Sequence, residues 1–125
     1  MVGLQAWILA LMGRDDEADR AAEGSRRLGA SDDAVTQILW HAAKGVVLAR
    51  RGESEEADRV SREGTDIADG TDSMDSATAW LARALVLDIL ERRSEATDAA
   101  RRSRELFAMK GWVSGIRRAE AVISG

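Results

Sequence analysis

The sequence predicts an all-α protein made of helix pairs that follow one another along the chain. Three observations favour this fold class. The 125 residues contain no proline, and most of the dominant types tolerate or favour a helix. Apolar residues recur at i, i+3 and i+4 steps, which is the spacing of one helix face. A short turn motif also recurs three times, which indicates internal repeats.

The turn motif is a turn residue followed by an acidic stretch and by an alanine five positions after the turn residue. Its copies occupy residues 13–19, 52–58 and 94–100, with Gly13, Gly52 and Ser94 as the turn residues. The spacings of 39 and 42 residues suit an antiparallel helix pair with its loop. Glycine takes the left-handed conformation that ends a helix, and Asp and Glu favour the positive end of the next one. The motif therefore predicts where one helix of a pair ends and its partner begins.

Seven helices are expected from these turns and from the apolar steps between them. They span residues 4–12, 15–28, 32–51, 54–69, 73–93, 95–110 and 113–123. Gly29, Gly70 and Gly111 supply C-terminal stops, while Ser31, Ser54 and either Ser73 or Asp72 supply N-caps.

Each helix pair is expected to carry an apolar stripe on both of its helices. On the first helices the stripes are Leu4, Trp7, Ile8 and Leu11, then Ile38, Leu39, Ala42, Ala43, Val46 and Val47, then Trp80, Leu81, Ala84 and Leu85. On the second helices they are Ala57, Val60, Gly64 and Ile67 in the middle copy and Ala99, Ser103, Leu106 and Phe107 in the last. Neighbouring pairs would bury these stripes against one another.

The small residues around the turns resemble the pattern of the tetratricopeptide-repeat family. That family has a small residue in the first helix, a turn glycine and an early alanine in the second helix. The middle copy matches it with Gly45, Gly52 and Ala57, the first copy with Ala6, Gly13 and Ala18, and the third copy with Ser94 and Ala99, while Leu87 stands where a small residue is expected. Two departures, the missing proline between units and a period longer than the usual 34 residues, predict a different curvature.

The resemblance implies a right-handed stack of antiparallel helix pairs, a TPR-like α-solenoid forming one domain. Its units would be residues 1–30, 31–70 and 71–111, followed by a terminal helix at 112–125. The closing stretch at 105–119 is similar to the ends of repeat arrays in large bacterial regulators of the nucleotide cyclase or regulatory ATPase types. This similarity implies a sensing or docking role for the repeats at the end of a longer chain. The short first helix indicates a fragment of a larger protein or a natural chain with an unprotected end, and the absence of cysteine favours a reducing, cytoplasmic compartment.

Composition excludes several classes of function. The chain has no cysteine, so disulfides, thiolate catalysis and thiolate metal sites are excluded. A net charge of -4 argues against a protein that binds nucleic acid by neutralising phosphates. The apolar run at 2–12 is too short to cross a bilayer and lacks preceding basic residues, so we expect neither a membrane span nor a signal peptide.

Catalytic or metal chemistry has little support in the sequence. His41 is the single histidine, and Gln37 and Lys44 on its helix face make no recognisable catalytic constellation. The acidic clusters at 15–17 and 55–56 are explained by their places at helix starts. We therefore expect no cofactor, no metal and no enzyme, with an enzyme kept as the remote alternative.

Aromatic and basic residues leave two questions open. Trp7, Trp40, Trp80 and Trp112 provide most of the aromatic area and are expected to pack between helices, with Trp7 as the best interface candidate. Five arginines near the C-terminus are expected on solvated helix faces, and the alternative is that they form a basic patch. They are Arg101, Arg102, Arg104, Arg117 and Arg118.

The leading hypothesis is a non-catalytic module that binds a protein or peptide. In the family register its concave wall would include Leu39, Val46, Arg50, Leu81, Asp88 and Arg92. The alternative is a homodimer that pairs through the apolar face of the first helix, formed by Leu4, Trp7, Ile8 and Leu11.

Overall fold

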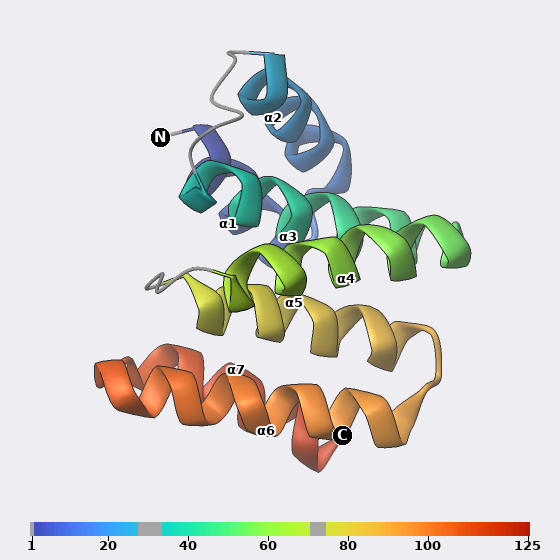
Figure 1. Ribbon diagram of the computed structural model, residues 1–125. Coiled ribbons are helices and arrows are strands. Elements are labelled where there is room, and N and C mark those ends of the chain that lie inside the picture. The colour runs from blue at the N-terminus through green and yellow to red at the C-terminus, as the bar shows by residue number, and fades with distance from the viewer. Residues whose placement is uncertain (1, 28–33, 71–74) are drawn as a thin grey trace.

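The computed structural model of the chain describes residues 2–27, 34–70 and 75–125. Within these residues it contains seven helices and no strand, which confirms the all-α prediction. The helices are α1 (Val2–Leu11), α2 (Asp15–Arg27), α3 (Ala34–Arg50), α4 (Ser54–Asp69), α5 (Ser76–Ile89), α6 (Arg93–Lys110) and α7 (Val113–Ser124). In Figure 1 they are layered in chain order, with α1 and α2 at the top and α6 and α7 at the bottom.

The helices make two kinds of contact. Each one packs against the next helix along the chain. The odd-numbered helices also pack on one another, α1 against α3, α3 against α5 and α5 against α7. Across the described ranges, by contrast, no packing contact joins α2 to α4 or α4 to α6. The odd helices therefore form one continuous layer, while α4 and α6 meet through the Arg102–Asp69 ion pair at 3.6 Å rather than through close packing.

The largest core cluster runs through the layer of odd helices. It joins Trp7 of α1, Leu39 and Val46 of α3 and Leu81 of α5, and it reaches Phe107 of α6. All five side chains are buried. Removing a large apolar side chain from water stabilises the fold by about 1.5–3 kcal/mol. Since each contributing helix buries its stripe against other helices, the stability of one pair depends on its neighbours.

The turns inside the pairs α1–α2, α3–α4 and α5–α6 have the same backbone geometry, which the turn at Gly111 between α6 and α7 shares. Gly13, Gly52 and Glu91 adopt positive φ angles of 78°, 81° and 62°. In each turn this residue donates its N–H to the carbonyl three positions earlier, and the next residue donates to the carbonyl five positions earlier. These bonds satisfy carbonyls at the end of a helix.

The third turn corrects the sequence-based prediction. Its turn residue is Glu91, whereas Ser94 lies inside α6. The turn residues are therefore 39 positions apart in both intervals. The prediction was wrong because a search for small turn residues does not find a glutamate in the left-handed conformation.

The corrected spacing also restores the small residues of the repeat. Ala6, Gly45 and Ala84 lie seven positions before the three turn residues. The prediction that Leu87 occupies this place in the third copy was therefore wrong. Five positions after each turn residue stand Ala18, Ala57 and Ala96, all fully buried. A Cβ added to Gly45 would lie 3.4 Å from the Cβ of Ser61. Small side chains at these places allow α3 and α4 to approach closely.

Predicted helix ends that fall on described residues agree with the structure within four residues, whereas the predicted ends at 28, 32 and 73 lie outside the described residues. The largest difference is at α5, which ends at Ile89 rather than at 93 because the Glu91 turn follows it. Gly70 and Gly111 are the C-cap residues of α4 and α6 as predicted, whereas Gly29 lies outside the described residues. Ser54 is the first helical residue of α4 and not its N-cap, a position that Glu53 occupies. The other predicted N-caps, Ser31, Asp72 and Ser73, lie outside the described residues.

Candidate functional site

An apolar groove of about 390 Å³ lies against the layer of odd helices. Residues from five helices and the segments just before them line it. They are Leu4, Trp7, Ile8 and Leu11 of α1, Val35 and Leu39 of α3, Asp75, Thr78 and Leu81 at α5, Phe107 of α6, and Trp112, Ser114, Gly115 and Arg118 at α7. We call this surface the apolar groove.

The apolar groove has a buried floor and an exposed rim. Trp7, Leu39, Leu81 and Phe107 belong to the core cluster, so the floor is fixed by the packing of the fold. At the rim Leu4 is 46% exposed, Ile8 is 47% exposed and Trp112 is 42% exposed. Large apolar side chains that are exposed together around a concave surface are typical of binding sites.

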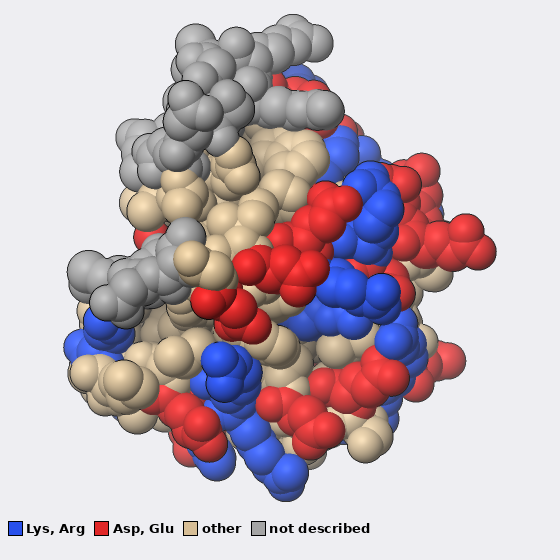
Figure 2. Space-filling model, viewed as in Figure 1, with Lys and Arg blue, Asp and Glu red and all other residues tan. Residues whose placement is uncertain are grey.

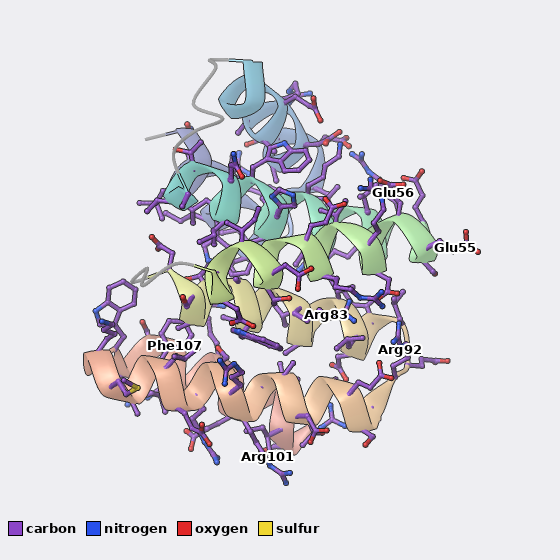
Figure 3. All side chains as sticks on the ribbon, in the orientation of Figure 1. Glu55, Glu56, Arg83, Arg92, Arg101 and Phe107 are labelled. Carbon is purple, nitrogen blue, oxygen red and sulfur yellow. The ribbon has the colours of Figure 1, made fainter. Side chains whose placement is uncertain are left out.

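The α7 side of the rim is held in place by a close helix contact. A Cβ added to Gly115 would lie 2.4 Å from the ring of Phe107, so the absence of a side chain lets α7 approach this ring. The Phe107 and Trp112 rings stack with centroids 6.1 Å apart. Figure 3 shows Phe107 towards the C-terminal end of α6, far from Arg92 at the other end. The stack holds Trp112 beside the groove.

Charge is distributed unevenly around the apolar groove. Helix α1 contains no charged residue. On the α7 side Arg118 is exposed and, within the part of the chain that the structure describes, makes no ion pair. Asp75 is the acidic residue in the lining and has a partner of its own. The groove is therefore neutral at its α1 side and carries an unpaired positive charge at its α7 side.

The residues predicted for a concave wall separate into two groups. Leu39 and Leu81 line the apolar groove. Val46 is fully buried in the core, which corrects its place on an exposed wall, because α5 packs against this part of α3.

The three charged residues of the predicted wall are in ion pairs at helix ends. Arg50 pairs with Asp15 at 2.8 Å, Asp88 pairs with Arg93 at 2.8 Å, and Arg92 pairs with Asp58 at 3.1 Å. None of the three is in the lining of the apolar groove.

Residues of the predicted concave wall and of the predicted self-association face lie together on one surface of the structure. Leu4, Trp7, Ile8 and Leu11, predicted as a self-association face, all line the apolar groove beside Leu39 and Leu81. Trp7 is buried, whereas Leu4 and Ile8 are exposed.

Sequence reasoning missed the contribution of α7 to the groove. Trp112 and Arg118 were considered as a packing anchor and as part of a basic patch. The turn at Gly111 could have indicated this contribution. After the pair α5 and α6, helix α7 takes the position that the first helix of a further pair would take, and it packs on both α5 and α6.

A second surface, which we call the charged cleft, lies between α4 and α6 over α5 and has a volume of about 600 Å³. Figure 2 shows basic and acidic side chains interleaved over this part of the molecule, and Figure 3 shows Arg83 and Arg92 between α4 and α6. Arg83 donates to Asp58 Oδ1 at 2.5 Å and to Ser61 Oγ at 2.9 Å. The cleft is thus occupied by ion pairs within the chain.

The Arg83–Asp58 pair repeats an ion pair one unit earlier. Lys44 of α3 donates to Asp19 of α2 at 2.5 Å, and both residues stand 39 positions before Arg83 and Asp58. In each case a cation on an odd helix binds an aspartate on the preceding even helix. We call these two pairs the inter-unit clasps.

Both clasp aspartates have lowered pKa values. Burial raises the pKa of Asp58, but the hydrogen bond and charge of Arg83, with the charges of Arg62 and Arg92, outweigh it. Burial likewise opposes the effect of Lys44 and Arg51, which lower the pKa of Asp19. The clasps therefore favour the ionised aspartates.

The remaining candidates have structural partners. His41 Nδ1 lies 2.7 Å from the carbonyl of Gln37, and Nε2 lies 3.3 Å from Glu63. In the described ranges no three His, Asp or Glu side chains are grouped to hold a metal ion. Within the acidic clusters, Asp15 and Asp16 pair with Arg50 and Arg51, and Glu56 pairs with Arg59, near the start of α4 in Figure 3.

The predicted basic patch is spread over several surfaces. Arg102 lies over the Trp80 ring, 5.1 Å from its centroid, in the charged cleft. Arg101 points away from α5 in Figure 3, and Arg118 lines the apolar groove.

No family model, no curated protein and no solved structure matches this chain. Among the described helices none is long and apolar enough to cross a membrane.

Proposed function

We propose that this chain is a non-catalytic docking module, a short right-handed TPR-like α-solenoid that holds a protein or peptide segment in its apolar groove. The observation that carries the proposal is the exposed rim of Leu4, Ile8 and Trp112 around a floor of core residues. Burying these rim side chains against a partner would stabilise a complex.

The solenoid interpretation is supported by the serial contacts and by the 39-residue period. Odd helices pack closely on odd helices, whereas among the described residues α4 and α6 meet through the Arg102–Asp69 ion pair without close backbone packing. A stack joined mainly along its odd helices curves towards them, so they would line the concave side. The two inter-unit clasps support the same arrangement, because equivalent residues join successive units.

Selection from a peptide library tests the docking function. Peptides selected on the wild-type chain should bind the Ile8→Ser variant at least about tenfold more weakly, because the rim loses a large apolar side chain. Met109→Ser is the matched control, since Met109 is 78% exposed but does not line the groove. Failure to select any peptide, or equal binding to both variants, would contradict the proposal.

Self-association through α1 is the second candidate, favoured by the exposure of Leu4 and Ile8 on this uncharged helix and of Met12 just after it. Light scattering tests it with Ile8→Glu, because substitution of the buried Trp7 would disturb the core. A dimer that becomes a monomer in Ile8→Glu supports this candidate, and a monomer in both chains removes it.

A further inference from the structure

We infer that the segment bound in the apolar groove is amphipathic and acidic, with apolar side chains on the groove floor and a carboxylate against Arg118. This inference rests on the proposed docking function and adds the chemistry and the orientation of the partner.

The apolar part of the partner follows from the lining. Leu39, Leu81 and Phe107 form a floor that offers few polar groups, and Leu4 and Ile8 extend the apolar surface to one edge. A volume of about 390 Å³ accommodates a few large side chains rather than a whole domain surface. A short segment with apolar side chains on one face fits this shape, as in other grooves that bind helices.

The acidic part of the partner follows from charge complementarity. Arg118 is exposed at the α7 side and is unpaired within the described residues. Ser114, one helical turn earlier, adds a hydroxyl to the same edge. A carboxylate placed here would gain a charge-assisted hydrogen bond, whereas a basic side chain would be repelled. Because α1 has no charge, the acidic end of the partner lies towards α7.

Helices α1 and α7, which expose apolar residues beside the groove, do not match this description, which argues against a second copy that docks through either of them. Helix α1 exposes Leu4 and Ile8 but has no acidic residue to meet Arg118. Helix α7 would bring Arg117 and Arg118 against the Arg118 of the other copy. A partner with its own carboxylate removes this repulsion.

Two synthetic peptides test the inference by fluorescence anisotropy. Both have about 14 residues with leucines at i, i+3, i+4 and i+7, and one carries glutamates at one end where the other carries lysines. The wild-type chain should bind the glutamate peptide about fivefold more tightly, the ratio expected for one exposed ion pair. The Arg118→Glu variant should reverse this preference, and the adjacent Arg117→Glu control should keep it.

The outcomes separate the inference from the docking function. Equal binding of both peptides, with both lost in Ile8→Ser, would overturn the acidic partner and leave the groove as a docking site. Binding that is insensitive to Ile8→Ser would overturn both. A wild-type dimer that separates in Ile8→Ser, with no peptide bound, would assign the groove to a second copy and overturn the inference.

Discussion

The inter-unit clasp between Arg83 and Asp58 should make a large contribution to stability. The side chain of Arg83 is 10% exposed and that of Asp58 is 24% exposed. In Arg83→Met, the hydrogen bonds to the Asp58 carboxylate, to the Asp58 carbonyl and to Ser61 are lost. Breaking a fully buried ion pair costs about 3–5 kcal/mol, and breaking an exposed one costs about 0–1 kcal/mol. Because Arg62 and Arg92 remain near Asp58, we expect a loss of about 2–3 kcal/mol.

Urea unfolding followed by circular dichroism measures this loss. A double-mutant cycle with Asp58→Asn should give a coupling energy of about 1 kcal/mol or more. Arg101→Met is the matched control, because Arg101 and Asp98 lie 3.9 Å apart and are both largely exposed. Its free energy of unfolding should change by less than about 0.5 kcal/mol. A coupling energy near zero would refute the clasp.

The pH dependence of the clasp has a definite sign. The folded-state pKa of Asp58 is lowered, so its contribution to stability is present above the ordinary aspartate pKa. This contribution is lost as the pH falls through the lowered folded-state value. The destabilisation caused by Arg83→Met should therefore be largest near neutral pH and shrink in acid. Equal destabilisation by Arg83→Met at neutral and at acidic pH would show that the effect does not come from the charge of Asp58.

Two further substitutions test the repeat geometry and the rim. Glu91→Gly should stabilise the chain by about 1 kcal/mol, because Glu91 has a φ of 62° that glycine adopts without strain, whereas Ser94→Gly inside α6 should give no gain. Equal melting temperatures for Glu91→Gly and Ser94→Gly would contradict the placement of the third turn at Glu91. Gly115→Ala should cost about 1–3 kcal/mol, because its Cβ would overlap the Phe107 ring, and Ser114→Ala is the control. An unchanged melting temperature for Gly115→Ala would show that α7 does not depend on this contact.

The sequence predicted the helices because their signals are local. Gly13 and Gly52 mark turns by their own conformational preference, and both have the positive φ angles expected. Glu91 could not be found in this way, because glutamate rarely adopts the left-handed conformation that it has in this turn.

The groove depends on non-local packing, which periodicity does not contain. Leu39 and Val46 share one apolar stripe in the sequence, yet Leu39 reaches the groove and Val46 is covered by α5. Arg118 meets the groove because α7 packs on α5 and α6. The stripe predicted which residues are apolar, whereas the arrangement of the helices decides which of them line the groove.

Methyl NMR during titration with the glutamate peptide tests the docking site most directly. We predict that the methyl signals of Leu4, Ile8 and Leu81 shift on binding, while that of Leu87 in the charged cleft stays in place. Shifts confined to Leu87, with Leu4 and Ile8 unchanged, would contradict docking in the apolar groove.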